Sequence, residues 1–409
     1  MKNPQNHIFD HTPETLTAWC VANGTQKFRA KQILEWVYEK GVIDPEQMTN
    51  LSKRDRDLLT SEMTFLSGKT VAHKKASDGT QKLLIEWDDA TEPVPFSSAP
   101  APATAPPGTS PATSATSLPV IGQAAPTGDS SRQTECVMIP SKDPTGDRRT
   151  ACLSSQIGCP VGCKFCASGL GGLDGNLTAG RIVEQVWRLC RLKDERGFPL
   201  GRISNVVFMG MGEPLANYGP VTHAIRTINA LWGLAISARK ITLSTVGLPA
   251  AIEKLAAEFE LPVTLALSLH APTDELRRTL IPWAQYSTIE QLLTACQKWF
   301  NKTGREITLE YTLLHGVNDL PEHAERLASL AKTLRANINL IRYNEVAGLP
   351  FGRPRDEAVN EFQRILRLRF VNAHIRASRG RDIAAACGQL RHEHRQSSPL
   401  PTDAAAAIA

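Results

Sequence analysis

From residue 151 onward, short apolar runs alternate with longer amphipathic stretches. We expect strands at residues 203–209, 240–245, 262–269, 306–313, 337–341 and 370–375, and an amphipathic helix at 178–196. Nearly continuous Val, Ile and Leu runs separated by helices are typical of a buried parallel sheet. The pattern predicts an α/β fold whose sheet curls into a barrel or part of one. In such folds the chemistry lies at the carboxyl ends of the strands.

The first 66 residues have a different pattern and predict a small helical module. Residues 30–40 place Ile33, Leu34, Val37 and Tyr38 on one face of a helix. The module also carries basic residues, so we interpret it as an accessory domain that contacts RNA, although a solvated face explains them equally well.

A β extension is predicted for residues 67–150. The runs 71–75 and 82–87 flank an Asp-Gly turn of the kind that joins hairpins, and residues 134–140 predict a third strand that pairs with them. Between them, residues 96–128 contain no charged residue and are dominated by Ala, Pro, Ser and Thr. We interpret about 90–132 as a disordered insertion, 151–390 as the catalytic core and 391–409 as a disordered tail.

Composition narrows the class of protein. The chain has 409 residues, a formal charge of +5 and nine cysteines. Neither a signal peptide nor a membrane span is evident, so we expect a cytoplasmic protein with reduced thiols. Eight arginines lie between Arg364 and Arg395, against only two acids, Asp382 and Glu393. This segment predicts a surface for nucleic acid, with a solvated basic helix as the alternative.

Three thiols form the most specific motif. Cys159, Cys163 and Cys166 have the spacing C-x3-C-x2-C within a short loop that contains glycine. Three thiolates can bind three irons of a cubane iron–sulfur cluster and leave the fourth iron open. The alternative is a structural zinc site, but such a site needs four ligands, and neither a second C-x2-C pair nor a His-x3-His pair follows.

Polar residues follow several of the predicted strands. They are Gly212 and Glu213, Ser244, Ser268 with Leu269 and His270, and Asn344. Glycines allow close approach of a ligand, and the carboxylate of Glu213 could accept a hydrogen bond from an ammonium group. A lone Ser or His at a strand end is more often an ordinary loop residue. Together, beside a loop with three thiols, these residues predict a site for a zwitterionic ligand that carries hydroxyl groups.

Several motifs in order resemble one family. They are FRAKQI at 28–33, SDGT at 77–80, SSQIGC at 154–159, GMGEPL at 210–215, LSLHA at 267–271 and RGRDIAAACGQL at 379–390. The chain closely resembles the bacterial RNA adenine-C2 methyltransferases of the radical S-adenosylmethionine (SAM) superfamily, from about Phe28 to Leu390. The resemblance implies a partial (β/α)6 TIM-like barrel that binds a [4Fe-4S] cluster through Cys159, Cys163 and Cys166.

The same resemblance implies a reaction. Two molecules of SAM are used per turnover: one methylates Cys387, and the other is cleaved to a 5′-deoxyadenosyl radical that abstracts hydrogen from this methyl group. The resulting carbon adds to C2 of adenine, Glu135 accepts a proton, and Cys152 releases the RNA by forming a disulfide with Cys387. The substrates would be 23S ribosomal RNA and transfer RNA. A low-potential reductant such as flavodoxin or ferredoxin would supply electrons to a monomeric enzyme.

Alternatives remain open from the residues alone. Cys387 lies between small residues but could be an inert packed thiol, Cys152 could be a buried strand residue, and Glu135 could be a surface carboxylate. Cys20, Cys136, Cys190 and Cys296 are expected to be small core residues. A related enzyme that methylates C8 of the same ribosomal adenosine, and so protects against antibiotics, would use Cys387 in the same way.

Overall fold

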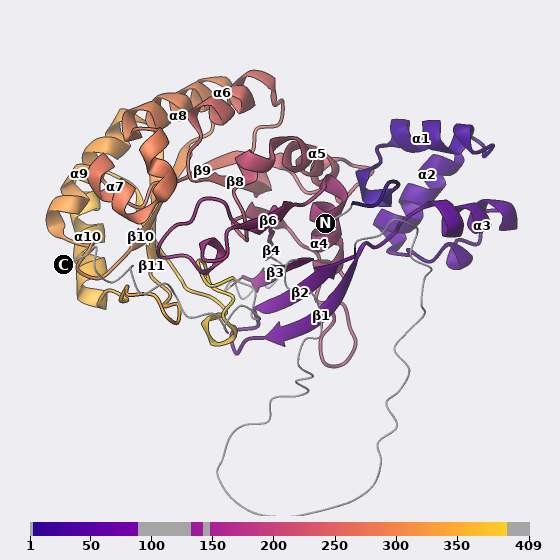
Figure 1. Cartoon of the computed structure of the whole chain (residues 1–409), viewed down its shortest axis with the longest axis horizontal. Coiled ribbons are helices and arrows are strands. Elements are labelled where there is room, and N and C mark those ends of the chain that lie inside the picture. Colours follow the sequence, from indigo (N-terminus) through magenta and orange to yellow (C-terminus); the bar gives the residue numbers. More distant parts are fainter. Residues whose placement is uncertain (1–2, 89–131, 142–147, 391–409) are drawn as a thin grey trace, which may run out of the picture.

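The computed structural model describes residues 3–88, 132–141 and 148–390. Its main feature is a ten-stranded sheet in the order β1-β2-β3-β4-β7-β8-β9-β10-β11-β12. The strands from β1 to β4 pair antiparallel, and those from β4 to β12 pair parallel. The expected α/β fold with a curled parallel sheet is confirmed (Figure 1).

The parallel strands are short and buried. They are β4 (Arg149–Cys152), β7 (Asn205–Phe208), β8 (Ile241–Thr245), β9 (Thr264–Ser268), β10 (Ile307–Leu313), β11 (Ala336–Arg342) and β12 (Ala373–Arg376). The strands are connected by α4 (Ala179–Leu189), α5 (Tyr218–Asn229), α6 (Pro249–Glu258), α7 (Asp274–Leu280), α8 (Ile289–Thr303), α9 (Pro321–Thr333) and α10 (Asp356–Leu368). Of these, α6, α8, α9 and α10 form the arc at the left and top of Figure 1.

Local sequence explains where these helices begin and end. At the start of α8, the Thr288 hydroxyl accepts from the backbone N–H of Gln291, and the Gln291 side chain accepts in return from the backbone N–H of Thr288. The helix ends at Gly304, which adopts a left-handed conformation that favours glycine.

The N-terminal module packs against α4. It contains α1 (Pro13–Ala22), α2 (Arg29–Leu34), the π-helical turn η2 (Glu35–Lys40) and α3 (Lys53–Glu62). Ile33, Leu34, Val37 and Tyr38 are buried, as predicted. The indole of Trp187 in α4 donates to the carbonyl oxygen of Val37 at 2.9 Å. The module therefore shares the main hydrophobic core instead of forming one of its own.

A buried carboxylate strengthens this junction. Glu184 of α4 accepts from the backbone N–H of Ser67 at 2.8 Å and lies 3.0 Å from His7 Nε2 and 2.7 Å from Arg188. Burial alone would raise the pKa of Glu184, but Arg188 and His7 lower it to about 2. The carboxylate thus connects the N-terminal module, the start of β1 and α4.

The β extension forms as predicted. Strands β1 (Gly68–Lys75) and β2 (Gln81–Trp87) form the hairpin, and β3 (Gln133–Pro140) joins it with Leu84 opposite Glu135. Strand β3 then pairs with β4, with Val137 opposite Cys152, so the extension continues directly into the parallel sheet. Nearly all of the expected insertion and the whole tail lie outside the described residues.

Two sequence-based expectations were wrong in detail, and one strand was missed. The helix expected over 178–196 ends at Leu189. Later in the same range the Asp194 carboxylate accepts from the backbone N–H groups of Arg196 and Phe198 and closes a turn. The strand expected from residue 370 begins at Ala373, because Phe370 has φ +58° and ends α10. Strand β4 was not predicted as an element.

Among the described residues, no helix is both long and apolar enough to span a membrane.

Candidate active site

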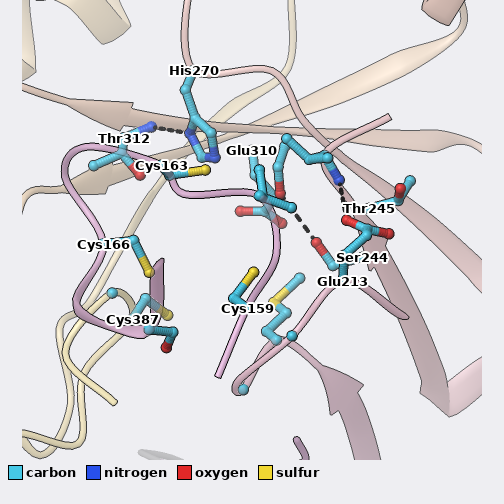
Figure 2. A pocket seen from close by; sticks show the side chains of 18 of the residues that line it. Cys159, Cys163, Cys166, Glu213, Ser244, Thr245, His270, Glu310, Thr312 and Cys387 are labelled. Carbon is cyan, nitrogen blue, oxygen red and sulfur yellow. Dashed lines mark hydrogen bonds between the residues drawn. The ribbon is translucent and has the colours of Figure 1, made fainter. Parts of the chain in front are cut away.

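A cavity lies at the carboxyl ends of the parallel strands (Figure 2). It encloses about 900 Å³ of space that atoms do not fill, part of it open to solvent. Its polar lining comes from the cysteine loop and the strand ends: Cys159, Cys163, Cys166, Ser168, Gly212, Glu213, Ser244, Thr245, Ser268, His270, Glu310, Thr312 and Cys387. Most of the expected site residues are therefore brought together.

The cysteine loop is held in place by backbone hydrogen bonds. The short hairpin of β5 (Gln156–Gly158) and β6 (Leu173–Asn176) leads into it. The N–H of Cys159 donates to Gly172 at 2.8 Å, and that of Lys164 donates to Leu280 at 3.0 Å. The three side chains point into the cavity from one side (Figure 2).

The donor set fits a cubane cluster better than a single ion. Burial raises the pKa of all three thiols, that of Cys159 to about 12, so bound iron would be needed to stabilise the thiolates. Within the described ranges, no three Cys, His, Asp or Glu side chains converge on one metal position. A zinc site requires such convergence, whereas each thiol of a cubane site binds a different iron.

A buried cation lies beside this loop and was not expected from the sequence. The Arg277 guanidinium is almost fully buried, and its Nε donates to the carbonyl oxygen of Leu269 at 3.1 Å. Burial lowers its pKa to about 10, and the Cys163 thiol acts in the opposite direction. Its positive charge would partly balance the negative charge of three thiolates.

The glycine-rich strand end permits close packing of the chain. A Cβ at Gly210 would meet the Leu153 carbonyl oxygen at 2.6 Å, and one at Gly212, where φ is +103°, would meet Gln156 at 2.7 Å. Larger residues would therefore displace the segment that leads from β4 to the cysteine loop. We expected these glycines to admit a ligand, and Gly212 does line the cavity, but close backbone packing is their immediate requirement.

Glu213 is buried and already hydrogen-bonded. One carboxylate oxygen accepts from the backbone N–H of Leu215 at 3.0 Å and the other from Val246 at 2.7 Å. Burial raises its pKa, and these hydrogen bonds oppose that shift. The carboxylate is fixed in orientation at the cavity wall, where it can still accept a hydrogen bond from a ligand.

The strand ends next to Glu213 offer hydroxyl and imidazole groups. Ser244 Oγ and Ser268 Oγ are 3.2 Å apart on neighbouring strands. His270 Nδ1 accepts from the backbone N–H of Thr312 at 3.0 Å, and burial followed by the charge of Arg277 lowers its pKa to about 3. The imidazole is therefore neutral with its hydrogen on Nε2, so it is a hydrogen-bond donor.

Two expected ligand contacts have other partners. The Leu269 side chain is fully buried in the main core and does not line the cavity; its backbone N–H and carbonyl oxygen bond to Glu310 and Arg277. Asn344 is also absent from the lining. Its Nδ2 donates to the carbonyl oxygen of Cys387 at 3.1 Å, so it holds the loop that carries Cys387.

The loop that carries Cys387 docks directly on the cysteine loop. The backbone N–H of Ala167 donates to Gly388 at 2.8 Å, and the Ser168 hydroxyl donates to Leu390 at 2.6 Å. Cys387 is exposed to the cavity and lies near Cys166 (Figure 2). Surrounding protein and the Glu310 carboxylate raise the pKa of its thiol, and Arg376 opposes them.

Cys152 lies beneath this loop. It is the last residue of β4, is 7% exposed, and packs in a small cluster with Val137, Met211 and Ala385. Burial raises the pKa of its thiol, and the nearby Cys387 adds to the shift. The structure thus brings together two thiols that are distant in sequence, both of them free.

Glu135 is buried in β3, two residues before the partner of Cys152, and is paired with a lysine. It is 1% exposed, and its Oε1 lies 2.6 Å from Lys82 Nζ, which also donates to the carbonyl oxygen of Ala384 at 3.0 Å. The alternative of a surface carboxylate is wrong. Lys82 connects Glu135 to the segment that carries Cys387.

Sequence reasoning therefore missed four residues: Lys82, Arg277, Glu310 and Thr312. A charged residue within an apolar strand, as in ITLEYTL for Glu310 and QKLLIEW for Lys82, was an available signal for two of them. Arg277 lies in a short helix with several other charges, and nothing in that pattern distinguished it. The expected core cysteines Cys20, Cys136 and Cys296 are buried, and Cys190 is partly buried.

The arginine-rich segment is less uniform than expected. Arg364 pairs with Glu361, Arg369 with Glu325, and Arg379 lies 3.6 Å from Asp78, so part of its charge is balanced locally. Arg391 and Arg395 lie outside the described residues. Arg376 and Arg381 lie close to the Cys387 loop.

Comparisons with known proteins identify the family. A model of the ribosomal RNA large subunit methyltransferase N-terminal domain matches residues 6–64, and the radical SAM superfamily model matches residues 153–331. The chain is 39% identical to a probable dual-specificity RNA methyltransferase RlmN of Rhodopirellula baltica, over 95% of this chain and 91% of that one. It is 39% identical to the dual-specificity RNA methyltransferase RlmN of Dichelobacter nodosus, over 94% and 93%.

A solved structure agrees with these relatives. The crystal structure of a radical SAM methyltransferase from Sphaerobacter thermophilus matches with a TM-score of 0.79 and 38% identity, over 95% of this chain and all of that one. A [4Fe-4S] cluster and SAM are the cofactors of this superfamily. The cavity lies at the carboxyl ends of the strands, where barrel enzymes have their active sites. The chain therefore belongs to the RlmN family of dual-specificity radical SAM RNA methyltransferases.

Proposed function

We propose that this enzyme methylates C2 of adenine in 23S ribosomal RNA and in transfer RNA, with Cys387 as the carrier of the methyl group. The observation that carries the proposal is the placement of Cys387: it faces the cavity beside the cysteine loop, above the buried Cys152 and Glu135. A radical enzyme that needed no protein thiol would not require this arrangement.

The need for a carrier follows from the chemistry of the target atom. C2 of adenine is an electron-poor carbon without a lone pair, so it cannot attack a sulfonium methyl group directly. The cluster and SAM, when bound, supply a radical that can abstract hydrogen from a methyl group. We propose Cys159, Cys163 and Cys166 as cluster ligands, and Gly212, Glu213, Ser244, Ser268 and His270 as the SAM contacts.

Cys387 first has to accept a methyl group. Its thiol must lose its proton for this step, and the surrounding protein opposes ionisation while Arg376 favours it. Its position between Ala386 and Gly388 leaves room for a methylthio group and for the adenine that is joined to it. Asn344, Ala167 and Ser168 hold the loop in place through hydrogen bonds.

Release of the product requires two further groups. Addition of the carbon radical to C2 would leave an unpaired electron on the adenine, and this electron would return to the cluster as Glu135 takes the proton from C2. Lys82 would orient the Glu135 carboxylate. The Cys152 sulfur, once deprotonated, would attack the Cys387 sulfur, so that an S–S bond forms as the S–C bond to the RNA breaks. The electron pair of that bond stays on the carbon and is protonated, which completes the methyl group. The new disulfide is then reduced before the next turnover.

The substrate and the electron source follow from this scheme. An adenine can reach the cavity only after leaving its stack, so the RNA site should be a loop or junction. We propose a low-potential flavodoxin or ferredoxin as reductant and a monomer as the active form.

The position of the methyl group tests the proposal. Cluster-loaded enzyme is incubated anaerobically with SAM, a reductant and a fragment of 23S ribosomal RNA or a transfer RNA, and the nucleosides are analysed by mass spectrometry. We expect C2-methyladenosine from both RNAs. C8-methyladenosine would instead support the related antibiotic-protecting activity, and the absence of methylated adenosine would rule out both.

A further inference from the structure

A second cavity opens beside the Cys387 loop. It is lined by Arg342, Arg353, Ile375, Arg376, Ala377 and Ser378. Arg342 ends β11 and Arg376 ends the neighbouring β12, where Ile341 and Arg376 are partners in register. Three guanidinium groups thus gather at the carboxyl end of the sheet, on the same edge as the main cavity.

These arginines are only partly neutralised. Arg342 Nη1 lies 2.8 Å from Asp356, whose side chain is 67% exposed and therefore well screened. Arg353 Nη1 donates to two neutral acceptors, the Tyr343 carbonyl oxygen at 2.8 Å and Asn344 Oδ1 at 3.3 Å. Like charges held this close repel one another, so an anion between them would be favoured.

Two donors in this cavity lack partners. Within the described residues, Arg342 Nε and Ser378 Oγ are buried and make no hydrogen bond. A buried donor without an acceptor costs on the order of 1–3 kcal/mol. Both groups line the cavity, so a bound ligand with several acceptor oxygens would satisfy them.

The cavity is connected to the proposed methyl carrier. Arg353 bonds to Asn344, and Asn344 bonds to the Cys387 carbonyl oxygen. Arg376 is close enough to lower the pKa of the Cys387 thiol. A ligand held here would therefore lie next to an adenine that is joined to Cys387.

We infer that Arg342, Arg353, Arg376 and Ser378 bind a backbone phosphate of the substrate RNA next to the target adenosine. The inference rests on the proposed function only in taking RNA as the substrate. Guanidinium groups match phosphate oxygens in geometry and charge, and extrusion of a base leaves its flanking phosphates at the rim of the site. A carboxylate offers similar oxygens, so the SAM carboxylate is the competing ligand.

Salt dependence of RNA binding tests the inference. Affinity of the cluster-loaded enzyme for an RNA hairpin is measured without reductant, at several salt concentrations. Arg342→Gln should weaken binding about tenfold and reduce the slope of log affinity against log salt by about 0.7–0.9, the value for one phosphate contact. Affinity for SAM should not change.

Arg335→Gln is the matched control. Arg335 lies next to the opposite end of β11, is 71% exposed and pairs with Glu306. The substitution removes the same charge from the other end of the barrel, so it should leave the affinity and the slope close to those of the wild type. Equal slopes for the wild type and Arg342→Gln would overturn the inference.

An RNA with one neutral linkage identifies the phosphate. A methylphosphonate beside the target adenosine should weaken binding to the wild type but have little further effect on Arg342→Gln. If every neutral linkage near the adenosine is equally harmful to both proteins, or if Arg342→Gln weakens SAM binding instead, the inference is wrong. These binding measurements do not depend on which carbon is methylated, so they can fail while the proposed function holds.

Discussion

The cavity contains two groups of cysteines that are assembled in different ways. Cys159, Cys163 and Cys166 belong to one loop, which is held by nearby backbone, by Leu280 and by the carboxyl-terminal segment. Cys152 and Cys387 come from the first parallel strand and from the segment after the last one. The first group is contiguous in sequence, whereas the second exists only when the carboxyl-terminal segment docks on the sheet. Cluster binding and methyl transfer should therefore be separable by mutation.

The docked segment is anchored at several points. Asp382 accepts from the backbone N–H of Ser77 at 2.8 Å, and Asp78 accepts from that of Gly380 at 3.1 Å. Lys82 donates to Ala384, as described above. The SDGT turn of the β extension thus holds the RGRD motif, which explains why an antiparallel extension is joined to a parallel barrel in this protein.

The first prediction, with the largest expected effect, distinguishes the two groups of cysteines. Cys163→Ala should remove one cluster ligand and abolish the iron–sulfur absorbance, cleavage of SAM and RNA methylation. Cys387→Ala should retain iron and sulfide but lower RNA methylation by roughly three orders of magnitude or more. Iron analysis, absorbance and nucleoside mass spectrometry measure these quantities. RNA methylation by Cys387→Ala at the wild-type level would contradict the assignment of Cys387 as the methyl carrier.

The second prediction concerns the buried member of the pair. Cys152→Ala should accumulate a covalent complex of protein and RNA, because the adduct forms but no thiol is available to break it. Cys136→Ala is the control, since Cys136 is also buried in the neighbouring strand β3. A shift on a denaturing gel that ribonuclease removes would identify the complex. Its absence in Cys152→Ala would remove Cys152 from this role.

The third prediction tests the link between the β extension and the site. Lys82→Met leaves the buried Glu135 carboxylate without its cation, which should destabilise the fold by about 3–5 kcal/mol. Adding Glu135→Gln should restore much of that loss, because no buried charge then remains. Urea unfolding of the two single variants and the double variant measures the coupling. Strictly additive effects would show that the pair does not interact.

The smallest effect concerns the junction with the N-terminal module. The pKa of Glu184 is about 2 in the folded protein, below its usual 4.5. Its contribution to the free energy of unfolding, about 3 kcal/mol, is thus present above pH 4.5 and is lost as pH falls toward 2. Glu184→Gln should lower stability near neutral pH by about that amount and flatten the acid limb of the stability curve.

The matched control for this last substitution is Glu258→Gln. Glu258 lies on the surface of α6, 3.9 Å from Lys254, and both side chains are more than half exposed. A solvated pair of this kind contributes little, so its loss should change stability by less than about 0.5 kcal/mol. Similar unfolding curves for the two variants would contradict the assigned role of Glu184.

Some strands could be predicted from the sequence and others could not, for physical reasons. The hairpin and most parallel strands were predicted because their apolar runs and turn residues are local signals. Strand β4 has only four residues and contains Arg149 and Thr150, so no periodicity marks it. Yet this strand positions Cys152. Phe370 was placed in a strand because it is apolar, although it is 95% exposed at the end of a helix.

The sequence alone determined the cysteine loop, the alternation of strands and helices, and the family, because each depends on residues that are close together or on motifs in a fixed order. Tertiary structure decided the rest. Only the folded chain shows that Lys82 neutralises Glu135, that Arg277 lies beside Cys163, that Asn344 holds the Cys387 loop, and that Leu269 belongs to the core. These contacts join residues far apart in the chain, and burial, which sets their charge and strength, arises only when the segments pack together.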